Sequence, residues 1–227
     1  MSELMQAQRI HKSFTKGASV IEVLHQVDFH VESGKTIAIM GESGVGKSTF
    51  LQILGGLLQP TQGDVLFEGK SIFQQTEDQI ASYRNEKIGF IFQFHYLLPE
   101  FSALENASMP MRIAGISEKK YNERAIDLLH RIGLGHRIHH RPSELSGGEQ
   151  QRVAIVRALV NQPKIVLADE PTGNLDTETA LNVSELLLSM VKENNMSLVI
   201  ATHSEQLATK TDRIYRLKSG KLGATNT

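Results

Sequence analysis

A glycine-rich stretch with the sequence GESGVGKS runs from Gly41 to Ser48 and matches the pattern G-x-x-x-x-G-K-[ST] without a mismatch. It follows an apolar run, KTIAIMG, and opens an apolar helical pattern, STFLQILGGLL. Between a strand and a helix, glycines let backbone N–H groups surround a phosphate, and the helix dipole favours the bound anion. A glycine-rich turn that binds nothing would not require this context. We therefore predict a nucleotide phosphate site in this loop.

Two side chains of the loop have specific expected roles. Lys47 should reach the β- and γ-phosphates, and the Ser48 hydroxyl should bind Mg²⁺. The residues predicted to bind the nucleotide through this loop are Gly41, Glu42, Ser43, Gly44, Val45, Gly46, Lys47, Ser48 and Thr49.

A second chemical feature is the acidic pair Asp169 and Glu170, which ends the apolar run KIVLADE. Ligands of open α/β sheets bind at the carboxyl ends of the strands, where a phosphate loop also lies. Asp169 is expected to hold Mg²⁺ through water, and Glu170 to act as the general base that polarises the attacking water. Taken alone, two acids after a strand more often begin a helix. Together with a phosphate loop, they favour nucleotide hydrolysis.

A third feature, ELSGGEQQRVAIVRAL, begins at Glu144 and places Ser146, Gly147, Gly148 and Glu149 at the expected start of a helix. A serine at the cap, glycines that expose N–H groups and an acid in the first turn can form a second anion site. The alternative is a well-capped helix without a ligand. One nucleotide does not need two phosphate cradles on the same chain. Two cradles fit a head-to-tail dimer in which each cradle serves a different nucleotide.

The elements that must position these residues follow from hydrophobic periodicity. Val20–Val31 alternates apolar and polar residues, which predicts a strand with one solvated face. Continuous apolar runs predict strands buried on both faces of a largely parallel sheet: Lys35–Gly41, Lys164–Glu170 and Ser197–His203. Helical spacing predicts one helix after a Ser117 cap and another before ENN, with apolar residues Tyr121, Ala125, Leu128 and Ile132, and Ala180, Val183, Leu187 and Val191.

The order of these elements predicts the fold class. We expect one α/β domain over residues 1–227, with a nucleotide-binding core at about 1–93 and 161–227. A helical lobe at about 94–160 is expected to be inserted into this core.

Composition restricts the partners. The 227 residues are 40% hydrophobic and 22% charged, as in a globular protein, and the formal net charge is −1. This balance lacks the basic stripe expected of a protein that binds nucleic acid. The sequence has no cysteine, the N-terminus MSELMQAQRIHKSF lacks a signal pattern, and no apolar run approaches the length of a membrane span. We therefore expect no direct membrane insertion, and any membrane role through a partner.

The motifs LSGGEQQR and LADEPTGNLD, in this order after the phosphate loop, resemble those of the ATPase subunits of ABC transporters over nearly the whole chain. The resemblance implies a P-loop NTPase core with a mainly parallel sheet, an N-terminal antiparallel β part and an inserted helical lobe. It also implies Mg²⁺ as cofactor and a homodimer that sandwiches two ATP molecules. Each ATP would then lie between the phosphate loop of one chain and the Ser146–Glu149 signature of the other.

The same resemblance implies further site residues. His203, in ATHS, matches a switch histidine that contacts the γ-phosphate, and Gln93 matches the glutamine that completes Mg²⁺ coordination. Phe14, in KSFTKG, stands where the family usually has a tyrosine that stacks on adenine. The interface loop of the dimer would contain Asn174, Leu175 and Asp176. The cluster of His136, His139 and His140 lacks acids or cysteines at ligand spacing and is expected to be solvated.

The segment Phe94–Phe101 follows Gln93 and is rich in apolar residues. Its side chains either form an exposed surface for a partner or pack inside the helical lobe. The wider stretch QFHYLLPEFSALENASMPM resembles the ATPases of lipoprotein-releasing complexes. This implies permease-type membrane subunits that contact Phe94–Phe101 and a peripheral location on the cytoplasmic face of the bacterial inner membrane. The alternatives are a macrolide-exporter-like ATPase, a non-transporting cell-division ATPase and, more distantly, a soluble ABC protein linked to nucleic acid.

Overall fold

The computed structural model describes residues 3–17 and 19–224. The chain divides into two compact units, one made of Met1–Arg84 with Ser197–Thr227 and the other of Asn85–Met196. The ends of the predicted 1–227 domain lie outside the described residues. The limits of the predicted lobe, 94–160, stay a prediction.

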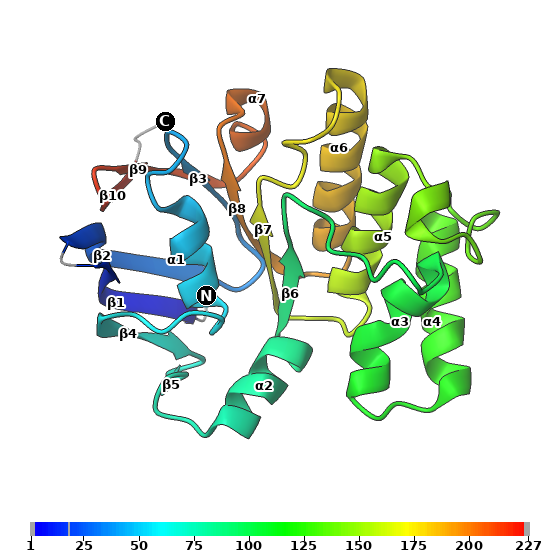
Figure 1. Ribbon diagram of the computed structural model, residues 1–227, viewed down its shortest axis with the longest axis horizontal. Helices are drawn as coiled ribbons and strands as arrows, with labels where there is room; N and C mark the ends of the chain where they lie inside the picture. Colours follow the sequence, from blue (N-terminus) through cyan, green and yellow to red (C-terminus); the bar gives the residue numbers. More distant parts are fainter. Residues whose placement is uncertain (1–2, 18, 225–227) are drawn as a thin grey trace. The chain divides into compact units, whose positions relative to one another are not determined.

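The first unit contains an antiparallel sheet, drawn in dark blue to teal in Figure 1. Its strands lie in the order β2-β1-β4-β5, where the elements are β1 (Glu3–Lys16), β2 (Ser19–Glu32), β4 (Gln62–Phe67) and β5 (Lys70–Ser71). All three pairings are antiparallel, which confirms the predicted N-terminal β part.

The predicted strand Val20–Val31 lies within β2, and its buried residues alternate as expected. The alternation shifts by one residue at Gln26, whose φ of 49° marks an irregularity in the pairing with β1. As a result Leu24 is buried before this point, and Val27 and Phe29 are buried after it.

Parallel strands also belong to this unit. Strand β3 (Thr36–Met40) pairs in parallel with β8 (Ser197–Thr202) and with β9 (Arg213–Lys218), and β10 (Lys221–Ala224) pairs antiparallel with β9. Nearly every residue of β3 and β8 is buried, as the continuous apolar runs predict. The helices of this part are α1 (Lys47–Leu54) and α7 (Glu205–Ala208), while α2 (Glu77–Glu86) spans the boundary between the units.

The second unit combines parallel strands with helices, drawn in green and yellow in Figure 1. Strand β6 (Ile88–Ile91) pairs in parallel with β7 (Ile165–Asp169). The helices are α3 (Ala103–Ile113), α4 (Glu118–Arg131), the short 3₁₀ helix η1 (Pro142–Glu144), α5 (Gly147–Leu159) and α6 (Thr177–Glu193). Helix α3 packs against α4 and α5, and α5 also contacts β6 and α6.

These helices agree with the predicted periodic segments. Ser117 is the N-cap of α4, although its side chain makes no capping hydrogen bond, and α6 ends at Glu193 with Asn194 as its C-cap. The stretch 94–160 is helical in separate pieces, because irregular segments lie before α3 and on both sides of η1. Within residues 3–17 and 19–224, no helix combines the length and apolar character that crossing a bilayer requires.

Candidate functional site

The phosphate loop adopts the expected strand–loop–helix arrangement. Strand β3 ends at Met40 and α1 begins at Lys47, with Gly46 as its N-cap. Gly44 and Gly46 have φ angles of 78° and 109°, a region that favours glycine. At Gly46 a side chain would also collide, because its Cβ would lie 2.8 Å from Cγ1 of Val23. The loop therefore needs these glycines to turn into the helix while β2 lies against it.

Lys47 is buried at the start of α1, and its ammonium group points back into the loop. Its Nζ donates hydrogen bonds to the carbonyl oxygens of Gly41 at 2.8 Å and Glu42 at 3.0 Å. The Ser48 side chain is exposed one residue further along the helix. The first turn of a helix carries N–H groups without intrahelical partners. The Lys47 ammonium group, these N–H groups and the Ser48 hydroxyl therefore all belong to the helix start, where an anion is expected.

His203 follows the strand next to this loop. Strands β3 and β8 are parallel, with Met40 opposite Thr202 in the register. Gly41 and His203 each come one residue later, so both leave neighbouring strands at the same edge. The exposed His203 thus lies at the same edge of this unit as the phosphate loop, and its contact with a terminal phosphate stays a prediction.

Phe14 lies on β1 opposite Ile21 of β2. Its side chain is 40% exposed, and Nζ of Lys12 lies 4.9 Å from the ring centroid. Val20 and Ile21 are also exposed, at 62% and 51%. An accessible aromatic ring can stack on a base, so adenine binding by Phe14 stays a prediction compatible with its exposure.

In the second unit, Asp169 ends β7 and Glu170 follows it at the carboxyl edge of the strand. Glu170 has a φ of 44°, which is unusual for a residue with a side chain. Such a conformation costs on the order of 1–3 kcal/mol and is typical of functional sites. The Glu170 carbonyl also accepts a hydrogen bond of 3.0 Å from the N–H of Gly173. The turn that follows the acidic pair is thereby closed.

Gln93 and the predicted interface loop are in direct contact. The Gln93 side chain donates from Nε2 to Oδ1 of Asn174 at 3.3 Å, and Nδ2 of Asn174 donates to the Gln93 carbonyl at 3.0 Å. A Cβ at Gly173 would lie 3.2 Å from the same Nε2. The structure thus brings together two residues that lie far apart in the sequence. The next residue of the loop with a defined role, Asp176, caps α6 by accepting from the Thr179 N–H at 3.0 Å.

The signature residues open α5 as predicted. Ser146 is the N-cap, its hydroxyl accepts from the Glu149 N–H at 3.3 Å, and Glu149 accepts from the Ser146 N–H at 2.8 Å. This last bond is the main reason that the pKa of Glu149 lies below its usual value. Ser146 and Gly147 are exposed, whereas Gly148 is buried. The carboxylate of Glu149 therefore caps its own helix, and Ser146 and Gly147 are the exposed residues of the predicted ligand site.

The two signature glycines have different surroundings. A Cβ at Gly148 would lie 2.5 Å from Cγ2 of Thr179, closer than atoms can approach without a shift. A Cβ at Gly147 would lie 3.5 Å from Cδ2 of Leu175, an ordinary contact. Packing therefore disfavours a side chain at position 148 but not at position 147.

The segment Phe94–Phe101 presents apolar side chains to solvent. Phe94 is 61% exposed, Tyr96 65% and Leu98 41%, while Leu97 and Phe101 are half-buried. The alternative in which all of them pack inside the lobe is therefore wrong for the exposed three. Exposed aromatic and aliphatic side chains that lie together are typical of an interaction surface.

Residues that sequence analysis did not select hold this segment. Arg157 donates to the carbonyl oxygens of His95 and Tyr96, Gln151 bonds to the His95 ring, and Asn106 bonds to the backbone of Leu98. Burial lowers the pKa of the Arg157 guanidinium from its ordinary value. The sequence did contain a signal for these residues, because Gln151, Arg157 and Asn106 are polar residues within apolar helical patterns.

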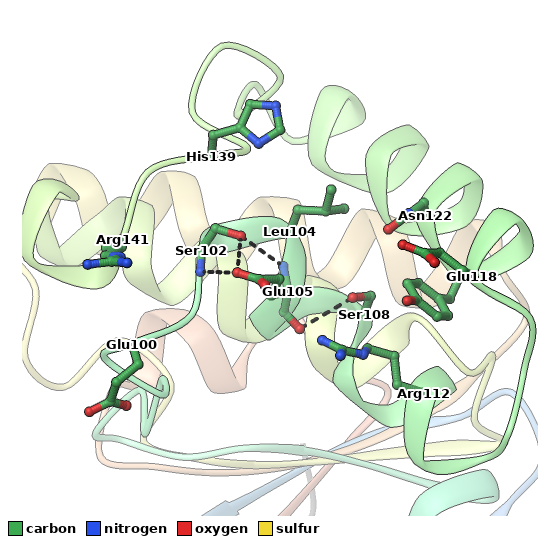
Figure 2. A pocket seen from close by; sticks show the side chains of 11 residues that line it. Glu100, Ser102, Leu104, Glu105, Ser108, Arg112, Glu118, Asn122, His139 and Arg141 are labelled. Carbon is green, nitrogen blue, oxygen red and sulfur yellow. Dashed lines mark hydrogen bonds between the residues drawn. The ribbon is translucent and has the colours of Figure 1, made fainter.

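A polar cavity of about 500 Å³ lies beside the segment, between α3, α4 and the loop before η1 (Figure 2). Its lining residues are Glu100, Ser102, Leu104, Glu105, Ser108, Arg112, Glu118, Tyr121, Asn122, His139 and Arg141. Glu105 forms a capping box with Ser102, and this backbone hydrogen bond lowers the pKa of Glu105. Because carboxylates and guanidinium groups both line the cavity, its charge selects neither an anion nor a cation.

The three predicted Mg²⁺ ligands are all oxygen donors. Ser48, Asp169 and Gln93 offer a hydroxyl, a carboxylate and an amide carbonyl, which are the oxygen donors that Mg²⁺ prefers. The amide nitrogen of Gln93 is turned toward Asn174, which leaves Oε1 as the possible oxygen ligand of that side chain. The donor set therefore fits the ion.

Comparisons with known proteins extend these observations. The family model described as ABC transporter matches residues 24–173. A curated relative from Syntrophus aciditrophicus (strain SB), named lipoprotein-releasing system ATP-binding protein LolD, is 50% identical over 96% of this chain and 98% of its own length. The protein of the same name from Geobacter metallireducens is 49% identical over 99% of this chain and 100% of its own length.

A solved structure has the same fold. The ATP-binding cassette MJ0796, described as a dimeric post-hydrolysis state bound to ADP and Pi, is similar with a TM-score of 0.90 and 35% identity. The match covers 99% of this chain and 100% of that one. The P-loop α/β fold expected from the sequence is thus confirmed.

Proposed function

The chain belongs to the ABC transporter family of ATP-binding proteins, and on this premise we propose that it is the ATPase subunit of a lipoprotein-releasing complex. The observation that carries the proposal is the near-full-length similarity, at about half identical residues, to relatives named for that system. Hydrolysis of ATP would supply the free energy that lifts a lipid-anchored protein out of a membrane.

Each motif of the chain has a task in ATP hydrolysis. The phosphate loop and Lys47 bind the phosphates of ATP, and His203 contacts the γ-phosphate. Glu170 accepts a proton from the attacking water as the water oxygen bonds to the γ-phosphorus, and the bond from the γ-phosphorus to the bridging oxygen breaks so that ADP leaves with that oxygen. Ser48, Asp169 and Gln93 would hold Mg²⁺, which when bound neutralises the charge on the phosphates.

We propose that two copies of the chain work together. Ser146 and Gly147 are exposed at the start of α5, where a helix dipole favours an anion, and their contact with the ATP of a second copy would complete its site. The dimeric state of the similar cassette supports this arrangement. Asn174, Leu175 and Asp176 would lie at the dimer interface, and Phe14 would stack on adenine.

We further propose that Phe94–Phe101 is the docking segment for the membrane subunits on the cytoplasmic face of the inner membrane. The exposure of Phe94, Tyr96 and Leu98 supports this proposal, since burial of such side chains against a partner is favourable. Gln93, directly before the segment, would link docking to the nucleotide.

The test uses Tyr96→Asp and Leu98→Asp, because a carboxylate that faces an apolar partner loses hydration without gaining a counter-ion. Ile113→Asp is the matched control, since Ile113 is 70% exposed but lies outside the segment. We expect the first two variants to keep the ATPase activity of the isolated chain and to lose both co-purification with the membrane subunits and lipoprotein release from vesicles. Normal assembly and release by Tyr96→Asp and Leu98→Asp would contradict the docking proposal.

A further inference from the structure

The docking segment Phe94–Phe101 is tied to α5, the helix that begins with the signature. Arg157 of α5 donates from Nη1 to the Tyr96 carbonyl at 2.7 Å and from Nη2 to the His95 carbonyl at 2.6 Å. Gln151 of the same helix is fully buried, and its Oε1 is hydrogen-bonded to Nδ1 of His95. Both contacts reach the part of the segment that carries the exposed Phe94 and Tyr96.

The backbone at Tyr96 requires such support. Its φ of 46° lies in the left-handed region, which is unfavourable for a residue with a large side chain. Conformations of this kind persist only where surrounding contacts impose them. The two charge-assisted bonds from Arg157 end on the carbonyls on either side of the Tyr96 N–Cα unit, so they fix the turn that points the ring outward.

The other half of the segment is held by α3. Asn106 is 1% exposed, its Oδ1 accepts from the Leu98 N–H at 2.8 Å, and its Nδ2 lies 3.0 Å from the carbonyl oxygens of Leu98 and Phe101. Helix α3 also packs against α5. The apolar side chains are thus displayed on a backbone that is anchored from the inside at both ends.

We propose that Arg157 is a positioning residue that joins the docking segment to the signature helix, so that the two move as one body. Ten residues separate Gly147 from Arg157, which is about 15 Å along a continuous α-helix. A displacement of the segment by a partner is then carried by α5 to Ser146. This inference rests on the proposed docking role of Phe94–Phe101.

Arg157→Lys is the informative substitution. Lysine keeps the positive charge but lacks the planar pair of donors that reaches two carbonyls at once. Arg157→Gln is the second variant, because it removes the positive charge and keeps a single donor group, and it serves if the lysine variant does not fold. Arg84→Lys is the matched control, since Arg84 also donates to a backbone carbonyl, that of Gly56 at 3.1 Å, but lies outside the docking segment and α5.

The first measurement is amide hydrogen exchange of residues 94–101 in the isolated full-length chain. Loss of a hydrogen bond to a charged group should accelerate exchange there by about tenfold in the Arg157 variants and leave it unchanged in Arg84→Lys. Unchanged exchange at residues 94–101 in both Arg157 variants would overturn the positioning role.

The second measurement is the ATPase activity of the chain alone and within the complex with its membrane subunits. We expect the Arg157 variants to keep the activity of the isolated chain and to lose the change in activity that the subunits produce. Retention of that change, in a variant whose segment exchanges faster, would overturn the coupling. If Tyr96→Asp also leaves assembly and coupling intact, the docking proposal itself has failed, so the two failures are distinguishable.

Discussion

The substitution Gly148→Ala tests whether the second glycine of the signature is required by packing. The added Cβ would lie 2.5 Å from Cγ2 of Thr179, whereas carbon atoms in contact normally lie about 3.5–4.0 Å apart. Either the Thr179 side chain must leave its rotamer, or the start of α5 or of α6 must move by about 1 Å. Overpacking of this kind costs about 1–3 kcal/mol, and the better helix propensity of alanine offsets up to about 1 kcal/mol.

We therefore expect Gly148→Ala to lower the free energy of unfolding by about 1–2 kcal/mol, which corresponds to a fall in Tm of roughly 2–4 °C per kcal/mol. Gly147→Ala is the matched control, because its Cβ would make only an ordinary contact, at 3.5 Å from Leu175. The assay is urea and thermal unfolding of the chain without nucleotide.

The cause can be isolated with a second change. Thr179→Ser removes Cγ2 and keeps the backbone N–H that donates to the Asp176 side chain. It should therefore restore most of the stability lost in Gly148→Ala. The next atom near the added Cβ is Cβ of Thr179 at 3.9 Å, which is acceptable. A Gly148→Ala chain as stable as the unmodified protein, or a double variant no better than the single one, would refute the packing argument.

Three further predictions concern catalysis and pH. Glu170→Gln keeps the shape but removes the basic oxygen, so ATP hydrolysis should slow by about 10²–10⁴-fold and an ATP-bound dimer should accumulate in gel filtration; near-normal turnover would exclude Glu170 as the base. Lys47→Ala and Ser146→Arg chains should each be inactive, while their mixture should regain ATPase activity through one intact composite site; a mixture as inactive as its components argues against shared sites. The lowered pKa values of Glu105 and Glu149 mean that their stabilising effect is present above the unfolded pKa of about 4.3 and is lost as the pH falls through the folded values. The stability lost on acidification should shrink in Glu105→Gln, and an unchanged pH profile would contradict this assignment.

Sequence patterns predicted the elements whose structure is determined by residues close together in the chain. Glycines at positive φ and a strand followed by a helix define the phosphate loop, and continuous apolar runs define β3, β7 and β8. The exposure of Phe94 and Tyr96 could not be predicted in this way. The backbone that carries these side chains is hydrogen-bonded to Arg157, 61 positions after Tyr96, and periodicity contains no information about such pairs.

The signature shows the same limit on a smaller scale. Its sequence groups Ser146, Gly147, Gly148 and Glu149 as one predicted ligand site. In the structure Glu149 caps its own helix and Gly148 makes room for Thr179, which leaves Ser146 and Gly147 at the surface. A motif can therefore combine residues needed for folding with residues available to a ligand. The two kinds can be distinguished only by their contacts in the folded structure.

The acidic pair and the interface loop are physically connected in a similar way. Glu170 holds a strained φ of 44°, and its carbonyl accepts the Gly173 N–H, which places the backbone of Gly173 beside the Gln93 amide. Gln93 is in turn hydrogen-bonded to Asn174 in both directions. A Cβ at position 173 would lie 3.2 Å from Nε2 of Gln93 and 3.4 Å from the Glu170 carbonyl oxygen, so the turn that presents Asn174 packs closely against both residues. Within this unit the predicted base, the predicted Mg²⁺ ligand Gln93 and the predicted dimer-interface loop are joined by three consecutive contacts.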